Sequence, residues 1–128
     1  MNNQAITVVY QWTPKAGQAE ALQAIYQQVA EQMQANEPNA LKVDCYFDPE
    51  RNVLVVYDLF KDAEALGLHL STTAAGHFPQ LLQIAEPGPF LFMGEVPGGL
   101  KQAAIGMGLN ATFAPQKFGF VRGETVPQ

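Results

Sequence analysis

The sequence has few of the residues that define several common protein classes. Only one of its 128 residues, Cys45, is a cysteine, so an internal disulfide is excluded and a multi-cysteine metal site cannot form. Charged residues make up 15% of the chain, and the seven lysines and arginines are scattered in a chain of net charge −5. This distribution argues against nucleic acid and anionic membrane as partners, because both require a clustered basic surface.

Long apolar runs are also missing. The longest, VLVVY and FLFM, are far too short to span a bilayer, and the polar start MNNQ lacks the basic and apolar regions of a signal peptide. We therefore expect a cytoplasmic protein, which also fits the single cysteine. A chain of this length forms one ordinary domain that buries about two-thirds of the surface of its unfolded form.

Apolar periodicity predicts four strands and two helices. Alternation with a period of two indicates a strand, whereas apolar residues three or four apart indicate a helix. We expect strands over 6–12, 41–47, 53–60 and 90–96, and helices over 20–36 and, in two short pieces, 61–70 and 74–85. The turn DPERN makes the second and third strands a hairpin, Asp62 is a candidate N-cap, and EPGP is expected to end the second helix.

This order of elements predicts an α+β fold of the ferredoxin-like βαββαβ type, with an antiparallel sheet and both helices on one face. Residues 1–97 contain no element that could cover the other face of the sheet. A second copy of the sheet is the simplest cover, so we expect a homodimer that forms a dimeric α+β barrel.

Residues 98–128 form a C-terminal extension to this body. A weak helix is expected near residues 100–109, followed by a short extended segment, KFGFV. The apolar residues Ile105, Met107, Phe118 and Phe120 indicate an arm that packs on the body or on the partner subunit, and we expect it to cross to the partner.

Two stretches carry a resemblance to a known family. TPKAGQAEAL forms a proline-glycine turn that opens the first helix, and VLVVYDLFKDAEALGLHL covers the third strand and the second helix, with a histidine near its end. In these features, over about residues 4 to 97, the sequence resembles the antibiotic biosynthesis monooxygenase family of dimeric α+β barrels. A tryptophan commonly stands nine residues before the histidine in that family, and here Phe60 holds this place before His69.

The resemblance implies a pocket between helices and sheet that binds an aromatic or polycyclic molecule. Members of the family sometimes oxidise such a molecule with O₂ and without a bound metal or flavin. The haem-degrading branch relies on an Asn, Trp and His set, and no matching Asn or Trp is found, because Trp12 lies on the first strand.

The two histidines of the chain are the first candidates for chemistry. His69 stands at the margin of an apolar helix stripe, where an imidazole can act as a general base on a phenolic substrate or can hydrogen-bond a carbonyl at the core edge. His77 precedes Phe78 and Pro79 and either contacts substrate or shapes a turn. Two histidines make a poor zinc site, so we expect no metal.

Aromatic residues supply the candidate substrate-binding surface. Stacking on a flat molecule is what such side chains do well, although core or interface packing is the commoner role. The candidates are Tyr10, Trp12, Tyr57, Phe60, His77 and Phe78.

Two further residues interrupt apolar strands. Asp58 must find a partner or stay in water, and Lys42 or Arg51 is the expected partner. Cys45 alternates with apolar residues on a face expected to be buried, where it would be a small hydrophobic residue and not a nucleophile.

The working hypothesis is a cofactor-independent monooxygenase that oxidises an aromatic or quinol-like small molecule with O₂, with His69 as the catalytic residue. A rival hypothesis is a binding protein whose cleft holds a small apolar molecule, or haem ligated by His69 or His77, without turnover. A third is a structural or stress-response dimer without a ligand.

Overall fold

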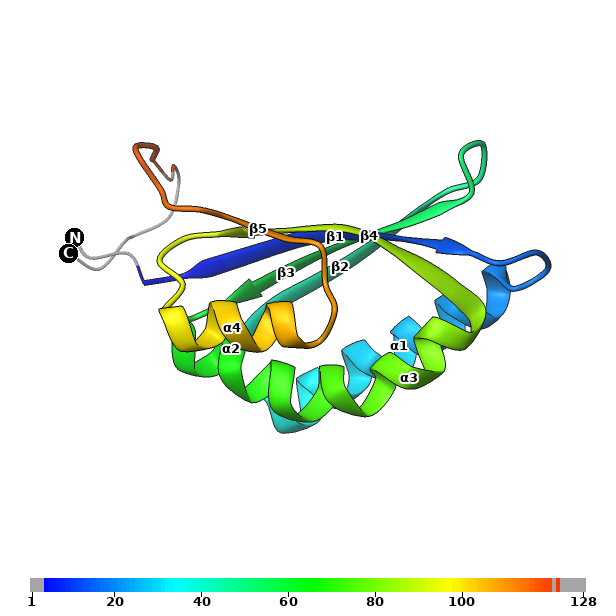
Figure 1. Cartoon of the computed structure of the whole chain (residues 1–128), viewed down its shortest axis with the longest axis horizontal. Coiled ribbons are helices and arrows are strands. Elements are labelled where there is room, and N and C mark those ends of the chain that lie inside the picture. The colour runs from blue at the N-terminus through cyan, green and yellow to red at the C-terminus, as the bar shows by residue number, and fades with distance from the viewer. Residues whose placement is uncertain (1–3, 121, 123–128) are drawn as a thin grey trace.

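The computed structural model describes residues 4–120 and 122, which form an α+β fold with a five-stranded mixed sheet (Figure 1). The sheet order is β2-β3-β1-β4-β5. The strands are β1 (Ile6–Pro14), β2 (Ala40–Asp48), β3 (Val53–Phe60), β4 (Ala85–Met93) and β5 (Ala111–Ala114). The helices are α1 (Ala19–Asn36), α2 (Ala63–His69), the π-helical segment η1 (Leu70–Ala74), α3 (Ala75–Ile84) and α4 (Gly98–Gly106).

Strands β1 to β4 confirm the predicted ferredoxin-like arrangement. β1 is central and pairs antiparallel with both β3 and β4, and β2 pairs antiparallel with β3. Alternate residues of β1 and β3 are buried, as their period of two requires. The helices all lie on the face of the sheet that these buried residues occupy (Figure 1).

The second helix is longer and more continuous than the sequence indicated. α2, η1 and α3 follow one another without a break, and Asp62 caps the first turn by accepting a hydrogen bond from the Ala65 N–H at 2.9 Å. Gly67 lies inside α2. Its lack of a side chain lets Leu100 of α4 approach, since a Cβ at this position would lie 3.3 Å from the Leu100 Cδ2 atom.

β4 begins earlier than predicted, because the segment EPGP lies inside the strand and does not follow the helix as a separate stop. β5 pairs with β4 only from Phe90 onward, so residues 85–89 form a sheet edge on that side. Proline lacks the N–H that a central strand needs but is tolerated at an edge, which explains how Pro87 and Pro89 fit.

The described part of the C-terminal arm folds back on its own chain. β5 adds to the sheet parallel to β4, and α4 lies beside α2 (Figure 1). The expectation that the arm crosses to a partner therefore does not hold for these two elements. Ile105, Phe118 and Phe120 are exposed, and residue 121 of the predicted extended segment lies outside the described residues.

Candidate functional site

A cavity lies between the helices and the sheet, as the sequence led us to expect. Its volume is about 40 Å³, and the walls are mainly apolar. Six of the seven residues proposed from sequence line it: Tyr10, Trp12, Phe60, His69, His77 and Phe78. The volume is enough for a few water molecules but far below the several hundred Å³ of an ordinary ligand pocket.

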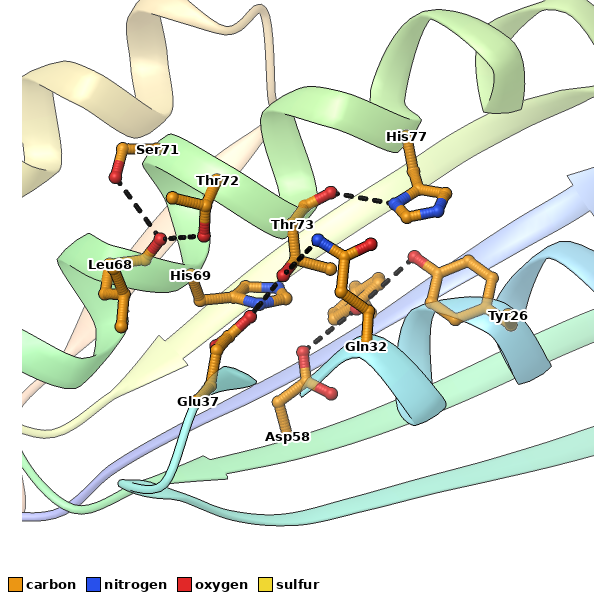
Figure 2. Close-up of polar contacts among 11 residues, drawn as sticks. Tyr26, Gln32, Glu37, Asp58, Leu68, His69, Ser71, Thr72, Thr73 and His77 are labelled. Carbon is orange, nitrogen blue, oxygen red and sulfur yellow. Dashed lines mark hydrogen bonds and ion pairs between the residues drawn. The ribbon is translucent and has the colours of Figure 1, made fainter. Parts of the chain in front are cut away.

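His69, the last residue of α2, is buried and held in one orientation by Glu37, which directly follows α1 (Figure 2). The His69 Nδ1 atom lies 3.2 Å from the Glu37 Oε2 atom. A carboxylate only accepts hydrogen bonds, so Nδ1–H donates and Nε2 is the nitrogen left to meet a molecule in the cavity. The Phe60 ring packs against the imidazole, with 5.2 Å between ring centroids.

Glu37 is a buried carboxylate with two donors on one oxygen. Burial alone raises its pKa, but hydrogen bonds from His69 and Thr73, together with the charge of His69, outweigh burial and hold the pKa below its ordinary value. The Thr73 hydroxyl donates to Oε2, and the Gln32 amide donates to the Thr73 hydroxyl at 3.3 Å (Figure 2). Glu37 is therefore ionised at neutral pH, and its hydrogen bond fixes the orientation of the His69 ring.

A second polar group reaches the cavity from the sheet. Asp58 of β3 is 2% exposed, and its Oδ2 atom accepts a hydrogen bond from the Tyr10 hydroxyl at 3.0 Å. Its Oδ1 atom is buried and has no hydrogen-bond partner among the described residues. Burial raises the pKa of Asp58 to about 6, although the charge of His69 and the bond from Tyr10 work in the opposite direction.

The Tyr10 hydroxyl belongs to a chain of buried donors. The Trp12 Nε1–H donates to the Tyr26 hydroxyl at 2.8 Å, and Tyr26 donates to the Tyr10 hydroxyl at 3.3 Å, which in turn donates to Asp58. Burial raises the pKa of both tyrosines, so both stay protonated at neutral pH. We call Trp12, Tyr26, Tyr10 and Asp58 the cavity floor.

Another part of the cavity wall consists of residues that are only partly buried. His77 and Phe78 come from α3, and Met107 follows α4. The His77 Nδ1–H donates to the Thr73 carbonyl at 3.0 Å, because a carbonyl cannot donate (Figure 2). Phe78 meets the Trp12 ring edge-on at 5.9 Å. We call His77, Phe78 and Met107 the cavity mouth.

Three sequence expectations differ from the observed placement. Tyr57 lies on the helix-free face of the sheet and does not line the cavity. The expected partners of Asp58 are engaged elsewhere, since Lys42 pairs with Asp44 and Arg51 with Asp48.

Cys45 is exposed and not buried as predicted. Partial burial of its thiol, followed by the charges of Asp58 and Asp44, raises the pKa of Cys45 to about 11. A thiol with this pKa stays protonated at neutral pH, so Cys45 is a poor nucleophile.

Two residues of the site, Glu37 and Tyr26, escaped the sequence interpretation. Tyr26 stands four residues after Leu22 and three before Val29, so helical spacing alone places it on the buried stripe of α1. Glu37 carries no such signal, because it directly precedes Pro38 and reaches His69 only through the packing of α1 against η1.

The arrangement suits acid–base chemistry. An oriented imidazole and a carboxyl group with a pKa of about 6 line one apolar cavity, and side chains of both types serve as general acids and bases. Among residues 4–120 and 122, no three His, Cys, Asp or Glu side chains come together as a metal site. None of the helices in this part of the chain has the length and apolar character of a membrane span.

Comparisons with known proteins agree with this fold. MupZ from Pseudomonas fluorescens superposes with a TM-score of 0.80 at 19% identity, covering 98% of this chain and 100% of its own. SnoaB from Streptomyces nogalater, described as a cofactor-independent oxygenase, superposes with a TM-score of 0.61 at 14% identity, covering 70% of this chain and 90% of its own. Rv0793 from Mycobacterium tuberculosis superposes with a TM-score of 0.63 at 14% identity, covering 73% of this chain and 96% of its own.

The match to MupZ includes most of the C-terminal arm, whereas SnoaB and Rv0793 match shorter parts of the chain. None of the curated proteins compared matches the sequence. The profile of one family, described as antibiotic biosynthesis monooxygenase, matches residues 5–81. This stretch is more than half of the chain and holds β1 to α2 with His69, so the protein belongs to the antibiotic biosynthesis monooxygenase family.

Proposed function

We propose that this protein is a cofactor-independent monooxygenase that oxidises an aromatic or quinol-like small molecule with O₂. The observation that supports the proposal is the His69–Glu37 pair at the wall of an apolar cavity. Glu37 holds the Nδ1–H, so His69 presents the lone pair of Nε2 as a general base. A fixed tautomer and orientation are what a catalytic imidazole requires.

The reaction balances without a further reactant when the substrate is a phenol. His69 takes the hydroxyl proton, and the resulting phenolate carries electron density at its para carbon. That carbon adds O₂ to form a peroxide, which takes up a proton. Loss of the remaining C–H proton and cleavage of the O–O bond then place one oxygen atom on the ring as a carbonyl and release the other as water. By this route 1-naphthol and O₂ give 1,4-naphthoquinone and water.

The mouth controls access to this chemistry. A cavity of about 40 Å³ does not accept two fused rings. Phe78 and Met107 are partly exposed and apolar, so a two-ring substrate enters by displacing them. Aromatic Tyr10, Trp12 and Phe60 then contact the flat faces of the substrate.

Oxygen uptake tests the proposal. Purified protein is mixed with 1-naphthol and a panel of hydroquinones, and we expect O₂ consumption with stoichiometric quinone formation. His69→Ala should lower kcat at least a hundredfold, as removal of a general base does. His77→Ala, a matched loss of an imidazole at the mouth, should act mainly on KM. No uptake with any substrate, or the same rate in His69→Ala, would remove the enzyme hypothesis.

The apolar lining also supports a second candidate, binding of a small apolar molecule or haem without turnover. A haem titration separates the two. A Soret shift that is lost in His69→Ala or His77→Ala supports ligation, and the absence of a shift removes the haem variant of this candidate.

We also infer that a second copy of the chain covers the helix-free face of the sheet. This face carries Val9, Val55, Tyr57 and Leu59, all only partly buried, and no helix of the described chain lies over it (Figure 1). Members of the family are typically dimeric. Light scattering should give a dimer at micromolar concentration, also after truncation behind Pro97, because α4 and β5 pack on their own chain. A monomer would contradict the inference.

A further inference from the structure

Asp58 is the buried group that the proposed oxidation does not use. It occupies a core-facing position of β3, between Val56 and Phe60 on the same face, and lies on the wall of the cavity. One of its oxygens is bound by Tyr10, and the other, Oδ1, has no hydrogen-bond partner among the described residues. A carboxyl oxygen that is buried and unpaired is costly, so its place beside a cavity calls for a ligand.

The cavity floor fixes the direction in which Asp58 can act. Trp12 donates to Tyr26, Tyr26 to Tyr10 and Tyr10 to the Oδ2 atom. Each donor in this chain is occupied, so Tyr10 and Tyr26 hold the carboxyl group in place and are not themselves free to bind a ligand oxygen. Only Oδ1 of this cluster is left for a molecule in the cavity.

We propose that Oδ1–H of Asp58 donates to the carbonyl oxygen of an enolisable ketone in the cavity, while Nε2 of His69 removes the α-proton. The chain then interconverts keto and enol forms without O₂. This inference rests on the proposed function, because it places the substrate against the same base. It adds a catalytic acid and a substrate class: small apolar ketones with an acidic α-C–H, and the phenols that are their enol forms.

The proposed step is a proton transfer at two atoms. The α-C–H bond breaks and its proton goes to Nε2 of His69. The electron pair of that bond forms the C=C bond, the π electrons of the carbonyl move to oxygen, and the oxygen takes the proton of Asp58. The carboxylate and the imidazolium that result are reset by proton exchange with water, so no oxidant or reductant takes part.

The surroundings of Asp58 keep its carboxyl group protonated below about pH 6 and partly protonated just above it. Burial and the charge of Glu37 raise the pKa, the charge of His69 and the bond from Tyr10 lower it, and the result is a pKa of about 6. Tyr26 of α1 and Cys45 of β2 are the other titratable groups coupled to Asp58, and both are neutral at this pH. A neutral carboxylic acid is an effective donor to a developing enolate oxygen.

Hydrogen–deuterium exchange under argon tests the inference. The probe is 2-tetralone in D₂O, and proton NMR follows loss of the C1 protons above the rate in buffer. Removal of O₂ makes the oxidation impossible, so the assay reports enolisation alone. The fluorescence of Trp12, the only tryptophan of the chain, reports binding of the ketone.

We expect wild-type protein to bind 2-tetralone and to accelerate exchange. Asp58→Asn, which keeps the size of the side chain but not its proton, should lower the accelerated rate at least tenfold. The exchange rate of the wild type should fall as the pH rises past 6, and this decrease should be missing in Asp58→Asn. Asp44→Asn, the same change on the neighbouring strand and on the other face of the sheet, is the matched control and should leave the rate unchanged.

Each result that differs from these expectations contradicts one part of the proposal. If 2-tetralone does not bind, or binds without accelerated exchange, the ketone assignment is wrong. If exchange is as fast in a folded Asp58→Asn protein as in wild type, Asp58 is not the acid. Oxygen uptake with 1-naphthol, without accelerated deuterium exchange in 2-tetralone, would support the proposed oxidation and contradict only this inference. Equal exchange in His69→Gln would remove the base on which both proposals rely.

Discussion

The floor and the mouth of the cavity are built on different principles. The floor comes from β1, β3 and α1, and its four side chains are almost completely buried and joined by hydrogen bonds. The mouth comes from α3 and from the chain after α4, and His77, Phe78 and Met107 are partly exposed. The floor therefore has one arrangement, whereas the mouth has side chains that can move without breaking the core.

The floor therefore holds a group of the proposed reaction, whereas the mouth controls which molecules reach the cavity. A group that transfers a proton needs a fixed position, and the floor provides one for Asp58 within the central strands of the sheet. A mouth with few polar contacts opens at low cost, because what it loses is mainly apolar packing of half-buried side chains. Substitutions in the floor should thus change stability and rate, and substitutions in the mouth should change which molecules enter.

The largest effect on stability is expected for Trp12→Ala in the floor. Trp12 is 1% exposed and packs against Phe78 and Phe90, so its loss leaves a large cavity and removes the donor to the Tyr26 hydroxyl. The free energy of unfolding should fall by about 3–5 kcal/mol, measured by urea denaturation. A fall below about 1 kcal/mol would show that the floor is not the rigid region described.

Asp58→Asn should raise stability at neutral pH. The pKa of Asp58 rises from its ordinary value of 3.8 to about 6, so between these values the folded chain binds more protons than the unfolded chain. Stability of the wild type then falls as the pH rises from about 4 to about 6, by up to about 3 kcal/mol, and stays lower above pH 6. The variant lacks this loss.

The control for this prediction lies in Glu37. Its pKa is lowered, so its contribution is present above the ordinary value of 4.5 and is lost as the pH falls. Both proteins keep this contribution, and the difference between their pH–stability curves isolates Asp58. Curves that run parallel from pH 4 to pH 7 would contradict the raised pKa.

Tyr26→Phe should have a smaller effect. The substitution keeps the ring but removes the acceptor of Trp12 and the donor to Tyr10, so one buried N–H is left unpaired. We expect a loss of about 1–2 kcal/mol, measured by urea denaturation. A double-mutant cycle with Asp58→Asn should show coupling between the two positions, since they share Tyr10. Strict additivity would mean that the chain of hydrogen bonds does not act as a unit.

The smallest effect on stability is expected for Met107→Ala at the mouth. Met107 is half-buried, so its truncation should cost only about 1 kcal/mol. The wider opening should instead lower the KM for two-ring phenols relative to one-ring phenols in the oxygen-uptake assay. An unchanged ratio of KM values would show that Met107 does not restrict entry.

Much of the fold could be predicted because its pattern is local. Alternation in β1 and β3, helical spacing in α1 and the short turn before β3 each specify an element from neighbouring residues. The start of β4 does not follow from its sequence, because proline is typical of a stop, and only the position of β5 shows that residues 85–89 lie at an edge.

The site was predictable only where a residue sits on a recognisable stripe. Tyr10 and Trp12 follow from strand periodicity, His69 from the margin of a helix stripe together with the family resemblance, and Tyr26 is accessible from helical spacing. The Glu37–His69 and Tyr10–Asp58 contacts join residues 32 and 48 positions apart, so they depend on how elements pack and leave no local signal. Whether Tyr57 faces the cavity likewise depends on which face of the sheet the helices cover, and the residues of β3 alone do not determine this.

The π-helical segment η1 settles how two histidines eight residues apart come to line one cavity. In a regular α-helix eight residues make two turns plus about 80°, which would direct His77 away from the face of His69. The wider π turn advances each residue by about 80° instead of about 100°, so the five residues Leu70–Ala74 take back about 100°. The chain uses one extra residue on this turn, and a separation of eight behaves like the separation of seven that aligns side chains on a regular helix.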